Sequence, residues 1–309
     1  MTVSIAVLWD SVTWEGNEPS EYEPVNPAYR VFSQLAREKG GRVYMAHYSW
    51  YRDGALDRAF CFRDGEWRRV EEVDVDVVFD KSDMSEDSRE VKKRVSEELP
   101  VINDYRLQEL VNDKLESYRS FPDHIPETRE ADREDVEEML GDYGRVVLKP
   151  RSDYGGTGVE VIDSIDDFEP REGLLVQRFV DPSDGIPGFD VSGPHDLRIQ
   201  VLSGDPAGAQ VRVPESGWVS NVHRGGETFF VELEDVPDRA LEIVEEVAEV
   251  LSAHDPSFYS VDFVFDRDGR PWILELNSKP GLVFYGSEEL EESKKKLMEK
   301  VVEELVNAV

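Results

Sequence analysis

Two hydrophobic segments near the C-terminal end of the chain constrain its fold more than any other feature. They read YSVDFVF (259–265) and PWILELN (271–277), and the dipeptide Asp268-Gly269 lies between them. Asp-Gly is favoured in the two-residue turns that join antiparallel strands. The sequence therefore predicts a β-hairpin with its turn at this dipeptide.

The register of the hairpin follows from its turn. Counting back from the dipeptide places Asp262 opposite Glu275. Alternate residues of a strand share a face, so Glu275 and Asn277 should point one way, and Leu274 and Leu276 the other. Like charges that face each other across two strands destabilise a sheet, so a positive charge is expected between the carboxylates. Mg²⁺ bound by Asp262, Glu275 and Asn277 fits; the alternative is a solvated outer face of an edge hairpin.

A second segment offers a place for a phosphate group. VVLKPRSDYGGTGVEVI (146–162) reads as strand, glycine-bearing loop and strand, with Lys149 near the end of the first strand. Gly155, Gly156 and Gly158 allow the backbone to approach a phosphate closely and to point amide groups at it. No Gly-Lys-Ser/Thr follows, and the next element is not a helix, so the loop is not a P-loop. An ordinary glycine hairpin is the alternative.

Arginines stand out between these two segments because the chain is so acidic. Arg198, Arg212 and Arg224 lie on strands or loops that flank the predicted hairpin. Planar guanidinium groups suit phosphate or carboxylate oxygens. Salt bridges to the many nearby acids are the alternative for each of them.

The composition limits the partners of the chain. A net charge of -33, from 68 acidic and 35 basic residues, repels nucleic acid and anionic lipid. The acids are spread along the whole chain, and lysines are few, which is typical of adaptation to a salt-rich cytoplasm. The single Cys61, the absence of a signal peptide and the absence of a long apolar run favour a soluble cytoplasmic protein.

The order of the predicted elements divides the chain into three regions. Strands alternate with helices over about residues 1–105, which predicts a small parallel α/β lobe. Helices are expected at about 105–119 and 131–140, and the Pro-, Gly- and Asp-rich loop at 180–196 predicts a boundary. The predicted domains are an N-terminal α/β domain, a small central lobe and a C-terminal lobe with the metal site, at residues 1–105, 106–182 and 183–309.

Several segments, taken in their order, carry a resemblance to a known family. They are NDKLESYRSF (112–121), VVLKPRSDYGGTGVEVI (146–162), LLVQRFVD (174–181), HDLRIQVLSG (195–204), SNVHRGG (220–226), VDFVF (261–265) and LELNSKPGL (274–282). Over about residues 105–285 the chain resembles the ATP-grasp enzymes, most of all the ribosomal-protein glutamate ligases and the bacterial-type glutathione synthetases. The resemblance implies an α/β (α+β) ATP-grasp fold with a parallel α/β lobe, a small α+β clamp lobe and a C-terminal antiparallel-sheet lobe.

The resemblance also implies roles for individual residues. Contacts to the phosphates and the adenine side of ATP fall to Lys114 and Lys149, and the loop closing over the triphosphate contains Gly155, Gly156, Thr157 and Gly158. The hinge that reads the adenine edge is Gln177, Arg178, Phe179 and Val180, with Asp196 near the ribose. The ligands of two Mg²⁺ ions, for which Mn²⁺ could substitute, are Asp262, Glu275 and Asn277. The residues around the transferred phosphoryl group and the acyl intermediate are Arg198, Arg212, Asn221 and Arg224.

The activity implied by the resemblance is that of an ATP-dependent carboxylate–amine ligase. Phosphoryl transfer to a substrate carboxylate gives an acyl phosphate, and an amine then displaces the phosphate to form an amide. Two alternatives stay open: a kinase that phosphorylates a hydroxyl at the same nucleotide site, and a nucleotide-binding protein without turnover. The expected substrates are a small-molecule carboxylate and an amine, such as amino acids or a peptide, and a homo-oligomer is left open.

Some positions depart from the family pattern. Arg178 stands where relatives usually carry an acid, Val219 where an arginine is common, and Lys279 where serine or alanine is frequent. The loop at 180–195 is also longer than in the ribosomal-protein ligases. Such loops tend to supply acceptor contacts, so these departures leave the substrates unidentified.

Overall fold

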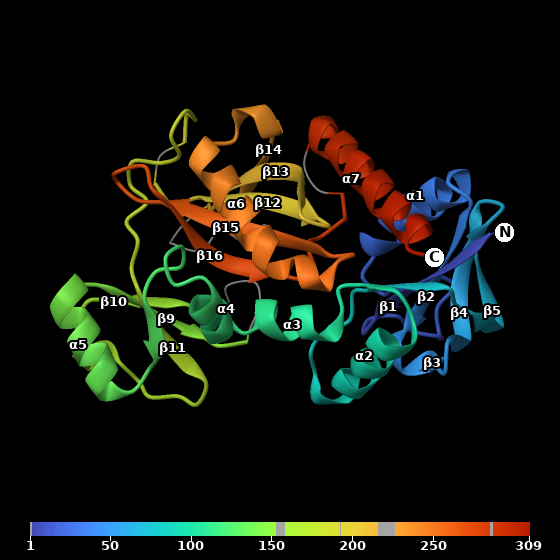
Figure 1. The fold of residues 1–309 in the computed structure, drawn as a ribbon, viewed down its shortest axis with the longest axis horizontal. Helices are drawn as coiled ribbons and strands as arrows, with labels where there is room; N and C mark the ends of the chain where they lie inside the picture. Colours follow the sequence, from blue (N-terminus) through green and yellow to red (C-terminus); the bar gives the residue numbers. More distant parts are fainter. Residues whose placement is uncertain (1, 153–157, 192, 216–225, 285–286) are drawn as a thin grey trace.

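The computed structural model describes residues 2–152, 158–191, 193–215, 226–284 and 287–309. In this part of the chain, three β-sheets follow one another along the sequence, and helices pack against each (Figure 1). This mixed α/β architecture, with one mixed sheet and two antiparallel ones, confirms the predicted fold class. The domain limits at 105/106 and 182/183 stay predictions.

The first sheet has the strand order β3-β4-β2-β1-β6-β7, with β5 paired to β4. The strands are β1 (Val3–Trp9), β2 (Gly41–His47), β3 (Tyr51–Arg52), β4 (Ala55–Arg63), β5 (Glu66–Asp74), β6 (Val77–Asp80) and β7 (Val101–Ile102). The strands β2, β1, β6 and β7 are parallel, but β3, β4 and β5 are antiparallel. The expected parallel α/β lobe is therefore present, and β3, β4 and β5 extend its sheet with antiparallel strands. The added hairpin turns at Asp64-Gly65, where both residues have positive φ angles of 51° and 85°.

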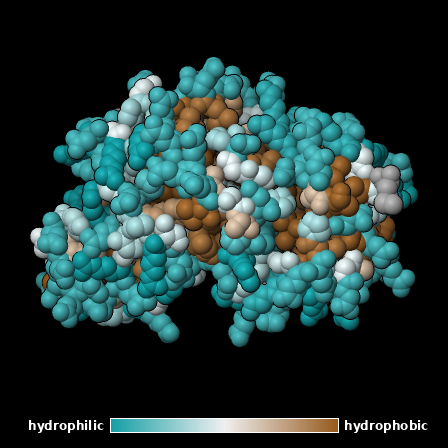
Figure 2. Space-filling view, in the orientation of Figure 1, coloured by the Kyte–Doolittle hydropathy of each residue, from teal (hydrophilic) through white to brown (hydrophobic). Residues whose placement is uncertain are grey.

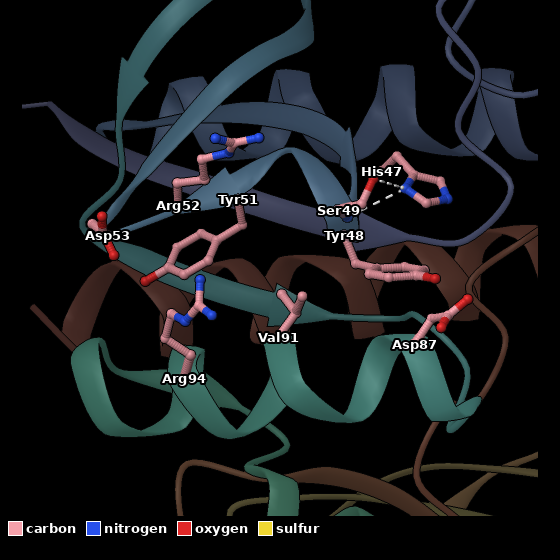
Figure 3. Close-up of a pocket in the computed structure, with 9 residues that line it drawn as sticks. All are labelled: His47, Tyr48, Ser49, Tyr51, Arg52, Asp53, Asp87, Val91 and Arg94. Carbon is pink, nitrogen blue, oxygen red and sulfur yellow. Dashed lines mark hydrogen bonds between the residues drawn. The ribbon is translucent and has the colours of Figure 1, made fainter.

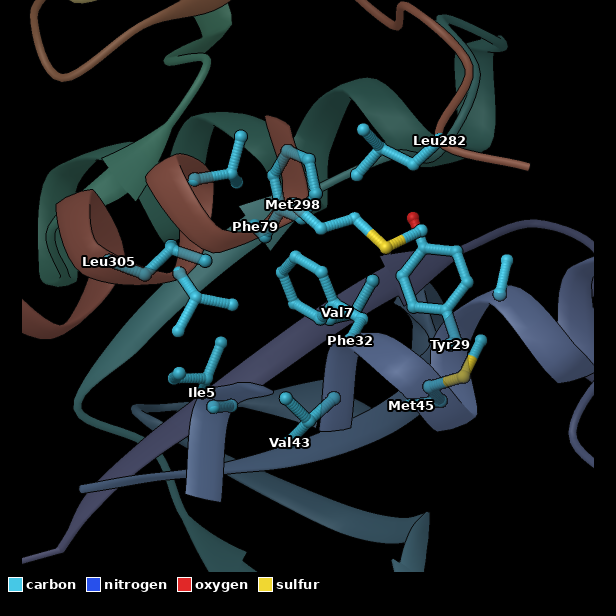
Figure 4. Close-up of a cluster of buried hydrophobic side chains, with 14 of the residues drawn as sticks. Ile5, Val7, Tyr29, Phe32, Val43, Met45, Phe79, Leu282, Met298 and Leu305 are labelled. Carbon is cyan, nitrogen blue, oxygen red and sulfur yellow. The ribbon is translucent and has the colours of Figure 1, made fainter. Parts of the chain in front are cut away.

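Two helices distant in sequence cover the same face of this sheet. They are α1 (Val25–Glu38) and α7 (Glu288–Asn307), which lie side by side, while α2 (Glu86–Glu98) lies beside the 3₁₀ turn at Tyr48–Trp50 (Figure 1). Buried residues of α7 recur at helical spacing, among them Met298, Val301 and Leu305. They pack on Phe32 of α1 and Ile5 of β1 in one cluster (Figure 4). The C-terminal helix is thereby held against the N-terminal sheet.

The second sheet is small and antiparallel, in the order β10-β9-β11-β8. Its strands are β8 (Thr128–Glu130), β9 (Val146–Pro150), β10 (Glu160–Ile162) and β11 (Leu174–Arg178), and α5 (Arg133–Tyr143) packs on it through Val136 and Met139. The helix expected at about 105–119 is divided into α3 (Tyr105–Asn112) and α4 (Lys114–Ser120). Asp113 causes the break, because its side chain accepts hydrogen bonds from the backbone nitrogens of Leu115 and Glu116 as the N-cap of α4.

The third sheet is antiparallel in the order β14-β13-β12-β15-β16. Its strands are β12 (Asp196–Leu202), β13 (Asp205–Val213), β14 (Glu227–Val231), β15 (Phe258–Phe265) and β16 (Pro271–Asn277), and α6 is Asp238–Leu251. Helix α6 covers one face, where Val244 and Val247 pack on Ile199, Val261 and Phe263. Residues of the opposite face include Arg198 and Asp262, which are not part of this core.

The predicted pairing of Asp262 with Glu275 is confirmed, but the predicted turn is wrong. Phe265 pairs with Pro271, and the backbone nitrogen of Asp266 donates to the carbonyl of Arg270, so the turn is wider than two residues. A β-bulge at Leu274 then shifts the register by one residue, which brings Asp262 opposite Glu275 as predicted.

The bulge also changes which side chains share a face. Leu274 packs with Val264 and Trp272, whereas Leu276 lies in the core under α6. The expectation that these two leucines point the same way is therefore wrong.

The surface agrees with the composition. Hydrophilic residues cover most of the face shown in Figure 2, and hydrophobic residues appear between them in limited patches. Within the described residues, no helix is both long enough and apolar enough to cross a membrane.

Candidate functional site

A buried network of two acids and two arginines lies on the face of the third sheet opposite α6. Arg198 on β12 is directly opposite Asp262 on β15, and Arg212 on β13 is directly opposite Asp196. The Nε and Nη2 atoms of Arg198 donate to the two oxygens of Asp262 at 2.7 and 2.6 Å. Arg212 donates from Nη2 to Asp262 and from Nε to Asp196, both at 2.7 Å. The sheet register thus locks four charged side chains into one unit.

These contacts explain the charge state of the acids. Burial raises the pKa of Asp262, whose residue is 3% exposed, but Arg198 and Arg212 together outweigh burial and hold the pKa below its usual range. For Asp196, burial outweighs the contact with Arg212 and raises the pKa to about 6. The positive charge expected beside Asp262 is therefore already supplied by two guanidinium groups. The pairing argument alone does not require a metal ion.

Two lysines bring the second sheet and α4 to the same place. Lys114 at the start of α4 lies 3.3 Å from a carboxylate oxygen of Glu275. Lys149 on β9 is buried, and its Nζ donates to Oε1 of Gln177 at 2.9 Å and to the carbonyl of Leu274 at 3.4 Å. Burial first, and then the charge of Lys114, lower the pKa of Lys149 to about 7, against the opposing effect of Glu275. Lys149, the lysine predicted beside the glycine-bearing loop, therefore contacts the predicted hairpin.

Gln177 has a side-chain role that the sequence did not predict. Its Nε2 donates to Oγ1 of Thr128 at 2.8 Å, which leaves Oε1 facing Lys149. Thr128 lies directly opposite Gln177 across β8 and β11. No local motif marks Thr128, because only the pairing of strands far apart in sequence brings it here.

The rest of the predicted adenine hinge joins the second sheet to the hairpin. The guanidinium of Arg178 lies 4.7 Å from the centre of the Trp272 ring, and the guanidinium of Arg145 lies 5.3 Å from that of Phe179. Val180 packs against Trp272 and Val264. The side chains of Arg178 and Val180 thus hold the base of the small lobe against β15 and β16.

The donor set suits a hard divalent cation only together with other oxygen ligands. Asp262, Glu275 and Asn277 offer two carboxylates and one amide oxygen, and the amide oxygen also accepts from the backbone nitrogen of Lys279 at 2.8 Å. Among the described residues, no group of three or more His, Cys, Asp or Glu side chains could hold a metal. Mg²⁺ is commonly bound by one or two carboxylates plus nucleotide phosphates and water, and these residues fit that arrangement.

Several predicted site residues lie outside the described residues. They are Gly155, Gly156, Thr157, Asn221 and Arg224, and Val219 lies there too. Gly158 is described, with a φ angle of +71°, and a Cβ atom there would lie 3.0 Å from Cγ of Pro150. This end of the glycine loop therefore requires glycine.

A separate hollow of about 700 Å³ lies in the N-terminal lobe (Figure 3). It is lined by His47, Tyr48, Ser49, Tyr51, Arg52, Asp53, Asp87, Val91 and Arg94. None of the predicted site residues lines it. Both signs of charge occur on its wall, and Nδ1 of His47 is held by Oγ of Ser49 at 2.8 Å.

Two curated proteins are similar to part of the chain. The glutathione synthetase of Anaplasma centrale is 33% identical over 148 residues, 47% of this chain and 47% of that protein. That of Gloeobacter violaceus is 30% identical over 179 residues, 54% and 49% of the two chains. The chain therefore spans about half the length of the curated relatives it matches.

A solved structure shares the fold over the whole chain. D-alanyl-alanine synthetase A from Vibrio cholerae superimposes with a TM-score of 0.65 and 15% identity, covering 100% of this chain and 99% of that one. Residues 113–267, half of the chain, match the family described as prokaryotic glutathione synthetase, ATP-grasp domain. This range contains Lys114 and Lys149 and the network of Asp196, Arg198, Arg212 and Asp262, and it ends before Glu275. The chain belongs to the prokaryotic glutathione synthetase ATP-grasp family.

Proposed function

We propose that the protein is an ATP-dependent carboxylate–amine ligase that forms an amide through an acyl phosphate. The observation that carries the proposal is the contact of Lys114 with Glu275 and of Lys149 with the carbonyl of Leu274, on the strand beside the Asp262–Arg198–Arg212 network. The two lysines of the central lobe suit a triphosphate, and the two arginines of the C-terminal lobe, which Asp262 and Asp196 hold in place, suit a reacting carboxylate. The names of the relatives, glutathione synthetase and D-alanyl-alanine synthetase, support this reaction class.

The nucleotide is assigned to the space between the second sheet and the hairpin. Lys149 and Lys114 offer their ammonium groups to phosphate oxygens, and the loop that ends at Gly158 would cover the triphosphate. Gln177 keeps the Lys149 side chain in place, since its Oε1 accepts from the Nζ atom. Asp196 is assigned to the ribose end, and its partner Arg212 links it to the reacting groups.

Asp262, Glu275 and Asn277 would hold Mg²⁺, which supplies charge neutralisation on the nucleotide phosphates when bound. Two ions, with Mn²⁺ as a substitute, are part of this proposal. Glu275 is the residue that could most easily exchange its present partner for Mg²⁺, because the described ion pair of Glu275 is with one lysine, Lys114, at 3.3 Å.

Arg198 and Arg212 are assigned to the reacting carboxylate and the acyl phosphate. Asp262 grips the Nε–Nη2 edge of Arg198, and both Asp196 and Asp262 hold the same edge of Arg212. Each guanidinium has five N–H donors, so each keeps donors for a ligand. The acids therefore position the arginines, and the arginines face the charge that develops during the reaction.

The reaction balances without a side-chain nucleophile. A carboxylate oxygen of the substrate attacks the γ-phosphorus, and the bond to the β-phosphate oxygen breaks to release ADP. The amine then attacks the acyl carbon, the acyl–oxygen bond breaks, and phosphate leaves with that oxygen. The amine loses a proton in the same step. Exclusion of water by the two lobes would protect the acyl phosphate from hydrolysis.

An assay of phosphate and ADP release separates this proposal from its alternatives. The protein is incubated with ATP, Mg²⁺ and pooled amino acids and dipeptides. High KCl is included because the acidic composition points to the cytoplasm of a salt-adapted cell. A ligase releases ADP and phosphate in equal amounts, and only with both substrates. A kinase releases ADP without phosphate, and a binding protein releases neither; either result would overturn the proposal.

A further inference from the structure

Among the residues that the structure describes, two buried lysines outside the candidate site have no acidic partner. Lys81, directly after β6, is 3% exposed, and Lys294 on α7 is 8% exposed. Their Nζ atoms donate to the carbonyls of Pro280 and Gly281, each at 2.9 Å. Among the described residues, neither lies within ion-pair distance of a carboxylate. By contrast, the buried Lys92 is paired with Asp80 at 2.6 Å.

The two lysines converge on one short segment that continues the candidate site. The carbonyls of Pro280 and Gly281 belong to consecutive residues shortly after the end of β16. The ammonium groups also feel the arginine network, since Arg198 repels both of them and Arg212 repels Lys294. The lysines therefore lie at the junction of the N-terminal sheet, α7 and the end of the hairpin.

An unpaired buried ammonium group is costly, so the absence of an acid calls for an explanation. The chain has 68 acidic residues, nearly twice its 35 basic ones. The residues outside the described ranges contain one acid, Asp153, in the glycine loop. Each ammonium carries three N–H donors and uses one on a backbone carbonyl. The Nζ atom of Lys81 also lies 5.1 and 5.7 Å from the ring centres of Phe79 and Phe258, and the remaining donors of both lysines are left for an anionic ligand that would keep them charged.

We propose that Lys81 and Lys294 bind a carboxylate of a substrate, distinct from the carboxylate that is phosphorylated. This rests on the proposed ligase function, in which Arg198 and Arg212 serve the reacting group. One substrate is then at least dianionic, in the class of dicarboxylates and acidic amino acids.

Proton uptake on ligand binding would distinguish a binding role of the two lysines from a structural one. Burial, followed by Arg198 and Arg212, lowers the pKa of Lys294 to about 7. Burial also lowers the pKa of Lys81, with Lys279, Lys294 and Arg198 acting in the same direction and Asp80 opposing. A bound carboxylate favours the charged ammonium, so binding at pH 8 takes up protons.

Calorimetry on the full chain tests the proposal. Succinate, glutarate, L-aspartate and L-glutamate are titrated at pH 8 in two buffers of different ionisation enthalpy, with glutaramide as the neutral control. At least one dianion is expected to bind with proton uptake, and glutaramide is not. Lys81→Met and Lys294→Met should each weaken that binding by tenfold or more and reduce the uptake.

A matched variant and a nucleotide titration complete the design. Lys296→Met changes an exposed lysine of the same helix and should leave dianion binding unchanged. A fluorescent ATP analogue should bind Lys81→Met and Lys294→Met as it binds the unmodified chain, which shows that they are folded. No dianion binding, binding without proton uptake, or binding indifferent to both substitutions overturns the inference. If the unmodified chain does not bind the ATP analogue, the proposed function is overturned instead.

Discussion

The contrast between Asp262 and Glu275 gives the sharpest prediction, because the two acids face each other but have different partners. Asp262 accepts three hydrogen bonds of 2.6 to 2.7 Å from two arginines and is buried. Glu275 has a side chain that is 24% exposed, and Lys114 at 3.3 Å has one that is 12% exposed. Both acids are assigned to nucleotide chemistry, so Asp262→Asn and Glu275→Gln should both abolish turnover.

Their effects on stability should differ. Asp262→Asn leaves the buried Arg198 with a neutral partner and Arg212 with Asp196 as its remaining acid, and breaking a buried ion pair in this way costs about 3–5 kcal/mol. For a lobe of this size that lowers Tm by on the order of 10 °C. Glu275→Gln removes a partly exposed pair worth about 0–1 kcal/mol and also relieves the repulsion with Asp262. Its Tm should stay within about 3 °C of the unmodified protein.

Differential scanning calorimetry of the two variants without nucleotide, beside the phosphate-release assay, checks this pair. If Asp262→Asn melts at the same temperature as the unmodified protein, the buried network does not have the described contacts. If Glu275→Gln unfolds the protein while the folded fraction keeps normal activity, the assignment of Glu275 to the metal is wrong.

Three further substitutions test the nucleotide side. Phosphate binding favours the charged form of Lys149, whose pKa is about 7, so the affinity for ATP should fall as the pH rises from 7 to 9. Lys149→Met should weaken ATP binding about tenfold or more and make it less dependent on pH. Titrations with a fluorescent ATP analogue measure both effects. Gly158→Ala places a Cβ atom 3.0 Å from Cγ of Pro150 at a φ angle of +71°, so the KM for ATP should rise in steady-state kinetics. An unchanged KM would show that ATP does not use this end of the loop. Arg178→Ala removes a cation 4.7 Å from the Trp272 ring and should lower Tm by a few degrees in a thermal scan, with no shift contradicting the bridging role.

Some of the fold could be predicted because local chemistry is decisive there. The hydrophobic strands of the hairpin and the pairing of Asp262 with Glu275 follow from residues within twenty positions of each other. The turn was predicted wrongly because Asp268-Gly269 is part of a wider turn held by Asp266, and the bulge at Leu274 compensated for the error. The two-residue Asp-Gly turn actually occurs at Asp64-Gly65, where the same signal would have revealed β4 and β5.

The contacts of the site could not be predicted, because they depend on sheet register across long sequence separations. Arg198 meets Asp262 only because β12 pairs with β15, 64 residues away. Lys149 reaches the carbonyl of Leu274 across two different sheets. Helical spacing from Leu290 and Met298 indicates that Lys294 lies on the buried face of α7, but nothing along the chain indicates its contact with the carbonyl of Gly281.

The fate of the carboxylate oxygen tests the central claim most directly. Amino acids with ¹⁸O in their carboxylates are supplied with ATP, Mg²⁺ and an amine, and the phosphate released is analysed by mass spectrometry. An acyl-phosphate mechanism transfers one ¹⁸O atom from the substrate to each phosphate. Phosphate released without the label, at a rate that depends on both substrates, would contradict the account.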